Sequence, residues 1–209
     1  MDVEDYIEKE KKPKKIYYIY AENSYLRNKF KQEFIQKFVP EAIRDFNLSY
    51  VNPGDEYLKR LSNAVQTPPM GAEKRYVISH FEDESLNQNQ KEKLLKIFEK
   101  INQSSTLIFL TANKVDKRKK FYLRLKEIVE YQEFETPRYR DLDQWIKSRF
   151  KEYNKKIDTK SLKMLENMFS NKLELLNSEI EKIVTRYPNK EKITYYDIKD
   201  IISREKFIE

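Results

Sequence analysis

Cysteine is absent from this chain of 209 residues. Disulfide bonds, thiolate nucleophiles and thiolate-bound metals are therefore excluded, and a cytoplasmic protein in a reducing compartment is expected. No apolar stretch approaches the roughly 20 residues that cross a bilayer. The charged segment 1–15 also lacks the apolar core of a signal peptide. We therefore expect no membrane partner.

Glycine is nearly as scarce, with only Gly54 and Gly71 in the chain. A phosphate-binding loop needs glycines, so that backbone N–H groups can wrap the phosphates, followed by Lys and Ser or Thr. The turn where such a loop would lie, residues 21–25, reads Ala-Glu-Asn-Ser-Tyr. It has no glycine, and Glu22 would repel a phosphate. ATP hydrolysis by this chain is therefore not expected.

Histidine occurs once, at His80, with no cysteine and no evident triad around it. The charged residues make up 37% of the chain, so neighbouring carboxylates are expected by chance and do not indicate a metal site. We predict no catalytic residue, no metal site and no cofactor, and we expect the chain not to be an enzyme.

Short apolar runs alternate with amphipathic stretches over the first two thirds of the sequence. Strands are predicted at residues 16–20, 48–51, 75–79, 106–111 and 129–134, because these runs are rich in β-branched and aromatic residues. Helices are predicted between them, starting after Asn23 or Ser24 and then near 58–65, 87–101 and 117–127. Strands that alternate with helices indicate right-handed crossovers and a mostly parallel sheet.

The pattern changes near residue 136. Beyond it no strand is predicted, and apolar residues at helical spacing favour helices at 139–153, 159–169, 172–187 and 194–203. Trp145 shares this spacing and is predicted to lie in the core. We therefore expect an α/β domain over residues 1–136 and a small, all-helical domain over residues 137–209.

The net charge of +7 is concentrated in segment 114–126, which has seven basic residues and one acidic residue, Asp116. One interpretation is the solvated face of a helix; the other is a surface for nucleic acid or an acidic subunit. A helix that begins near residue 117 would hold four cations in its first turn, where the helix dipole disfavours them, and this slightly favours a function. The candidate contact residues are Lys114, Lys117, Arg118, Lys119 and Lys120.

The segment Pro68-Pro69-Met70-Gly71 interrupts the alternation between a helix and a strand. Two prolines stiffen the chain, methionine is a large and adaptable apolar residue, and glycine permits a sharp bend. The segment could present an apolar plug on the surface, or it could be an ordinary turn with Met70 in the core. The residue types alone do not decide between the two.

The order of these features resembles the first two domains of the delta subunit of the bacterial DNA polymerase III clamp loader. The family opens with Tyr-x-Leu-Tyr-Gly-x-x-x-Tyr-Leu, which residues 17–26 match with isoleucine at the first leucine and alanine at the glycine. A Phe-Asn pair matches Phe46-Asn47, and a Thr-x-Pro-apolar-apolar stretch with Glu-Arg/Lys-Arg matches residues 67–75. A Lys-x-Asp-Lys-Arg-Lys-Lys segment matches residues 114–120, and the helical part is similar at 145–146, 173–182 and 193–198.

The resemblance implies a P-loop-NTPase-like (AAA+-like) domain without its phosphate loop, followed by a lid-like helical domain. It further implies a subunit of the polymerase III holoenzyme without an ATPase site, which binds the sliding clamp (the beta subunit) and helps to open it in DNA replication. Its partners would be the clamp, the other clamp-loader subunits and, through the assembled complex, DNA. The family's third, collar domain has no counterpart in these residues. The alternative function is a nucleic-acid-binding module that uses segment 114–126.

Members of the family touch the clamp with two adjacent apolar side chains that follow the proline and enter a pocket on the ring. These map to Met70 and Gly71, so the resemblance assigns clamp binding to Pro69, Met70 and Gly71. Glycine departs from the pattern because it has no side chain to insert. Either a neighbour such as Pro69 replaces it, or the clamp contact of this member is weaker or altered.

Overall fold

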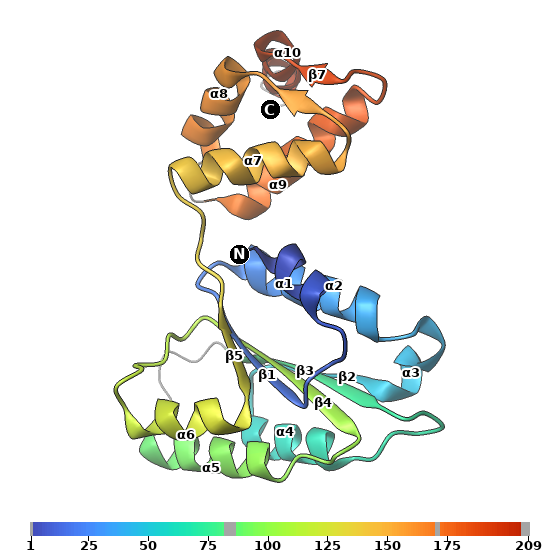
Figure 1. Ribbon diagram of the computed structural model, residues 1–209, viewed down its shortest axis with the longest axis vertical. Coiled ribbons are helices and arrows are strands. Elements are labelled where there is room, and N and C mark those ends of the chain that lie inside the picture. The colour runs from blue at the N-terminus through green and yellow to red at the C-terminus, as the bar shows by residue number, and fades with distance from the viewer. Residues whose placement is uncertain (1, 82–86, 170–171, 206–209) are drawn as a thin grey trace. The chain divides into compact units, whose positions relative to one another are not determined.

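The computed structural model describes residues 2–81, 87–169 and 172–205, with side chains up to residue 201. The chain divides into two compact units, Met1–Glu135 and Thr136–Glu209. Each unit has a hydrophobic core of its own and is described by itself below (Figure 1).

The first unit is built on a five-stranded sheet with the order β2-β3-β4-β1-β5, in which every pairing is parallel. The central strand β4 is buried at all its positions, because strands pair with both its edges and helices cover both faces of the sheet (Figure 1). The predicted mostly parallel α/β fold is confirmed. The strands are β1 (Ile16–Tyr20), β2 (Leu48–Val51), β3 (Arg75–Phe81), β4 (Ser105–Thr111) and β5 (Glu130–Glu133).

Helices α1 (Val3–Lys9) and α2 (Ser24–Phe38) lie on one face of this sheet, and α4 (Tyr57–Gln66), α5 (Gln88–Glu99) and α6 (Lys120–Ile128) lie on the other (Figure 1). The short η1 (Glu41–Ile43) and α3 (Arg44–Asn47) connect α2 to β2. On the second face, apolar residues of α4, α5 and α6 form one cluster with β1, β3 and β4. The first unit therefore has the three layers expected of a doubly covered parallel sheet.

Aromatic rings fill the core beneath α1 and α2. The apolar stripe of α2 places Phe30 and Phe34 against Tyr17 of β1, with ring centroids 5.9 and 5.3 Å apart. Tyr6 of α1 contacts Phe30 at 6.1 Å. Helix α1 was not predicted, because its buried residues (Val3, Tyr6 and Ile7) are few and stand among charged ones.

The second unit contains α7 (Arg140–Glu152), α8 (Thr159–Phe169), α9 (Leu173–Arg186) and α10 (Tyr195–Glu205). It is helical except for β6 (Lys156–Ile157) and β7 (Lys192–Ile193), which pair in parallel. The expectation of no strand after residue 136 is corrected here, since strands of two residues are too short to produce an alternating pattern. Trp145, predicted to be core, is half-buried on α7.

Two polar residues fix the loop between α9 and α10. Lys155 is buried, and its Nζ donates to the carbonyl oxygens of Tyr187, Pro188 and Lys190 at 2.5, 2.9 and 2.9 Å. The Asp197 carboxylate accepts from Lys190 Nζ at 2.6 and 2.7 Å and from the backbone N–H of Thr194 at 2.8 Å. Burial acts to raise the pKa of Asp197, but the bonds from Lys190 and Thr194 outweigh it and hold the pKa below its ordinary value.

Candidate functional site

The turn between β1 and α2 lies at the position of a phosphate loop. The Asn23 side chain accepts a hydrogen bond from the Tyr25 N–H at 2.9 Å, so this donor of the first helical turn is already bonded. The buried Arg27 donates from Nη1 to the carbonyl oxygens of Ala21 and Glu22, at 2.5 and 2.9 Å. A phosphate loop presents N–H groups to its ligand. Here carbonyl oxygens of the turn instead converge on a guanidinium of the same chain.

Met70 lies on the segment that joins α4 to β3, and 67% of it is exposed. Of the two interpretations left open by the sequence, the exposed plug is therefore the one that the structure contains. The backbone beneath the side chain is fixed by Asn47, which is buried. Its Oδ1 accepts from the Met70 N–H at 2.7 Å, and its Nδ2 donates to the Met70 carbonyl at 2.9 Å. An apolar side chain thus projects from a tethered backbone.

The two residues predicted beside Met70 contribute less apolar surface. Gly71 has a φ of +62°, a left-handed conformation that favours glycine, although no heavy atom lies within 4 Å of an added Cβ. Pro69 is half-buried. Among Pro69, Met70 and Gly71, therefore, only Met70 presents a large, exposed apolar side chain.

An exposed aromatic residue near Met70 was not predicted as a site residue. Phe46 immediately precedes Asn47, and 63% of it is exposed. Its carbonyl accepts from Arg75 Nη1 at 2.8 Å, while Nη2 of the same guanidinium donates to Ser49 Oγ at 2.6 Å. The signal that could have indicated it is topological. Because β2 and β3 are parallel neighbours, the residues preceding each strand meet at one edge of the sheet.

The basic residues of segment 114–126 are largely paired with acidic ones. Lys114 and Lys117 both lie near Glu133 of β5, with N–O distances of 3.8 and 3.2 Å. Burial acts to raise the pKa of Glu133, but hydrogen bonds from Tyr131 and Lys117 and the charge of Lys114 lower it below its usual range. The carboxylate is therefore ionised and offsets part of the lysines' charge.

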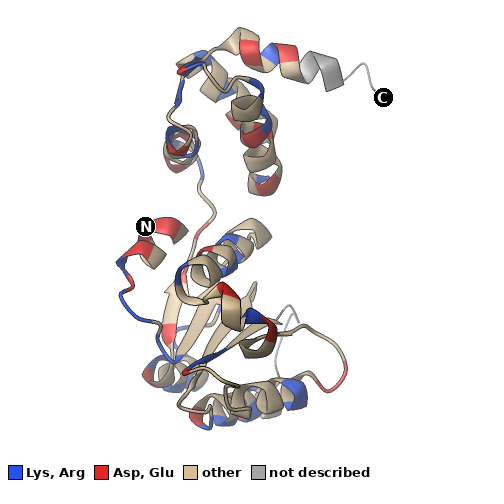
Figure 2. Ribbon diagram, turned by 90° about the vertical axis from the view of Figure 1, so that its right-hand side faces the viewer, with Lys and Arg blue, Asp and Glu red and all other residues tan. Residues whose placement is uncertain are grey.

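Two arginines of the same segment are also paired. Arg118 donates to Asp116 from Nε and Nη2 at 3.1 and 3.2 Å, and Arg124 pairs with Glu92 and Glu99. Figure 2 shows residues of both signs on the helices of this unit. Within the part of the chain that the structure describes, Lys119 and Lys120 have no ion pair, so they are the candidate residues of this segment that stay most available.

The prediction that a helix begins near residue 117 is wrong. Helix α6 begins at Lys120, with Lys119 as its N-cap residue. The Asp116 side chain accepts the N–H of Arg118 at 3.0 Å and so forms a turn before the helix. The cations at 117 and 118 therefore lie outside the first helical turn, and the argument from the helix dipole is reduced to Lys119 and Lys120.

Neither metal binding nor a membrane-spanning helix is indicated by the described residues. No group of three or more His, Asp or Glu that could hold a metal ion occurs in ranges 2–81, 87–169 and 172–205. In the same ranges, no helix combines the length and apolarity required to span a membrane.

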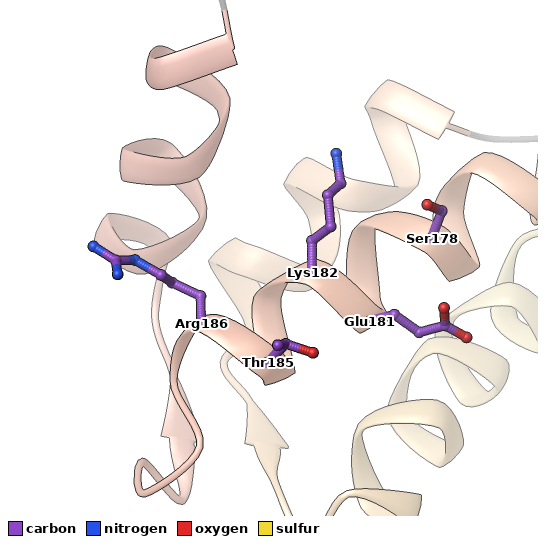
Figure 3. A pocket seen from close by; sticks show the side chains of 5 residues that line it. All are labelled: Ser178, Glu181, Lys182, Thr185 and Arg186. Atoms are coloured by element: carbon purple, nitrogen blue, oxygen red, sulfur yellow. The ribbon is translucent and has the colours of Figure 1, made fainter.

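A shallow pocket on α9 is lined by Ser178, Glu181, Lys182, Thr185 and Arg186, which all project from this one helix (Figure 3).

The fold and the altered turn define a class of protein, a P-loop-NTPase-like chain whose phosphate-loop position holds an arginine-bound turn. Comparison with known proteins specifies the family. The family model described as "DNA polymerase III, delta subunit" matches residues 17–135, more than half of the chain. The chain therefore belongs to the DNA polymerase III delta subunit family.

Individual relatives agree with this assignment. The chain is 26% identical to DNA polymerase III subunit delta of Bacillus subtilis (strain 168) over 197 residues, which are 90% of this chain and 57% of that protein. The structure of the Bacillus subtilis DNA clamp loader delta protein is similar with a TM-score of 0.72 and 21% identity, covering 96% of this chain and 61% of that one. This chain thus spans about 60% of the length of both.

A second solved structure is similar in fold alone. A DNA polymerase III gamma subunit-related protein from Thermotoga maritima gives a TM-score of 0.50 at 15% identity, over 86% of this chain and 56% of that one. The predicted AAA+-like fold class is confirmed by these structural neighbours together with the parallel sheet.

Proposed function

We propose that this chain is a non-catalytic clamp-loader subunit, which binds the sliding clamp and helps to open it in DNA replication. The observation that carries the proposal is the exposed Met70 side chain on a tethered backbone, at the position to which the family resemblance assigns the clamp contact. Family membership and the likeness to a clamp-loader delta structure support the same function. The arginine-bound turn at Ala21 and Glu22 supports a subunit that does not itself hydrolyse ATP.

In this function the α/β unit would contact the ring and the helical unit would take the place of a lid. The other clamp-loader subunits would assemble with it in the cytoplasm, and DNA would be met through the assembled complex. Binding can open a ring only if the chain has a higher affinity for the open ring than for the closed one. Burial of a methionine side chain contributes about 1.5–3 kcal/mol, so Met70 can supply a useful part of that affinity.

Titration calorimetry of the purified chain with the purified cognate clamp tests this proposal. We expect saturable binding that weakens about tenfold in Met70→Ala, because most of the side chain is available for burial on the ring. Met168→Ala is the matched control, since Met168 is 43% exposed and lies on α8 in the other unit. Absence of binding by the unaltered chain would contradict the function, and equal binding by both variants would contradict the contact.

A further inference from the structure

We infer that Phe46 supplies the second apolar side chain of the clamp contact, which Gly71 cannot provide. The contact would then be made by Phe46 and Met70, from two segments of the chain, instead of by two adjacent residues. This inference rests on the proposed function and specifies which residues of this chain enter the apolar pocket of the ring.

The two segments are joined by hydrogen bonds at Phe46 and at the residues that follow it, Asn47 and Ser49. Asn47, its neighbour in the chain, binds both backbone groups of Met70, at 2.7 and 2.9 Å. Arg75 binds the Phe46 carbonyl at 2.8 Å and the Ser49 hydroxyl at 2.6 Å. The backbones of residues 46–49 and 70–75 are thus held together as one edge. Two large, exposed apolar residues, Phe46 and Met70, therefore belong to one hydrogen-bonded edge.

Exposure distinguishes Phe46 from Pro69, the neighbour of Met70 that could replace an apolar side chain at position 71. Phe46 is 63% exposed and Met70 is 67% exposed, whereas Pro69 is half-buried. Aromatic side chains contribute much of the buried area in protein interfaces and recur among the residues that dominate binding. Phe46 is therefore better placed than Pro69 to fill the remainder of an apolar pocket that already receives Met70.

The conformation of Gly71 explains why this chain would use a residue from another segment. A side chain at φ +62° would be strained, and a bulky or β-branched one is rare there. The sharp turn at residue 71 and an apolar side chain at that residue are therefore difficult to combine. A phenylalanine on the neighbouring segment provides the apolar surface and leaves the turn unchanged.

The test compares four variants of the chain in calorimetric titrations with the clamp. Phe46→Ala and Met70→Ala are each expected to weaken binding about tenfold, as expected for truncating a residue that dominates an interface. Phe46→Leu retains an apolar side chain and is expected to bind within about threefold of the unaltered chain. The matched control is Tyr139→Ala, which removes an aromatic residue that is 84% exposed and lies outside the first unit.

The possible outcomes separate the inference from the proposed function. Weaker binding by Met70→Ala together with unchanged binding by Phe46→Ala would overturn the inference and leave the function intact. No binding by the unaltered chain would overturn both. Concentration-dependent self-association that Phe46→Ala abolishes, measured by analytical ultracentrifugation, would assign the residue to contact with a second copy and also overturn the inference. Thermal unfolding of each variant confirms that an altered affinity does not reflect loss of the fold.

Discussion

Asn47 links the stability of the first unit to the presentation of Met70, and its replacement by alanine should affect both. The change removes two hydrogen bonds to the Met70 backbone. A typical intramolecular hydrogen bond contributes about 0.5–1.5 kcal/mol. Met70 is exposed, so its freed N–H and carbonyl can bond to water and suffer little desolvation penalty. We therefore expect Asn47→Ala to lower the free energy of unfolding by about 1–2 kcal/mol.

The same change should weaken binding to the clamp although it removes no apolar atom from the contact. If the Met70 segment becomes mobile in the free chain, the free energy needed to order it is subtracted from the free energy of binding. If binding loses the same amount that folding lost, about 1–2 kcal/mol, the Kd becomes about 5–30-fold higher. Asn47→Asp keeps the acceptor for the Met70 N–H but places a carboxylate against the Met70 carbonyl, so we expect it to destabilise the segment at least as much.

Denaturant unfolding followed by far-UV circular dichroism measures the stability, and hydrogen exchange over residues 67–75 measures the loosening of the segment. Asn63→Ala is a suitable control, because Asn63 is an exposed asparagine on α4 in the same unit and its replacement should be neutral. Slow exchange of the Met70 amide in Asn47→Ala, with an unchanged free energy of unfolding, would refute the reasoning that Asn47 holds the segment.

Three further predictions concern other parts of the molecule. Lys155→Met removes three charge-assisted hydrogen bonds but also the cost of burying an ammonium group, so we expect the second unit to lose about 2–4 kcal/mol of stability. Fluorescence of Trp145, the single tryptophan, reports this unfolding. The lowered pKa of Asp197 stabilises the second unit above the ordinary value of 3.8, and this stability is lost as the pH falls through the lowered pKa. The free energy of unfolding of Asp197→Asn should therefore depend less on pH below that value. An unchanged pH dependence would contradict the stabilising role of the Asp197 carboxylate. Finally, any DNA binding by the isolated chain should depend on Lys119 and Lys120, so their joint change to glutamine should reduce the slope of log K against log salt by about 2. An unchanged slope in a fluorescence anisotropy titration would show that other cations make the contact.

The sheet could be predicted from the sequence largely because its inner strands, such as β1 and β4, carry a continuous apolar signal. The run 106–111 is buried on both faces, as its composition indicated, and residues 16–20 also form a buried strand. Helix α1 gave no comparable signal. Its three buried residues are held by tertiary contacts, such as that between Tyr6 and Phe30, which no local pattern specifies.

The candidate site was predictable in part, for a similar reason. Met70 belongs to a local motif, but the residue types left its exposure open, and the structure shows it 67% exposed on a backbone bound to Asn47. Phe46 is 24 residues away in the sequence and becomes a neighbour only through the parallel pairing of β2 and β3. The basic segment shows the opposite case. Its charge was evident, whereas the pairing of Lys114 and Lys117 with Glu133 depends on a strand that follows the segment in the chain.

Arg27 has a consequence for protein engineering. A designer who wished to give this chain a nucleotide site would naturally begin by substituting glycines and a lysine into residues 21–25. Those substitutions would leave the carbonyl oxygens of Ala21 and Glu22 directed at the Arg27 guanidinium, because the arginine enters from the helix and not from the loop. Grafting a working loop would therefore require replacement of Arg27 as well, so several coordinated changes would be needed instead of one.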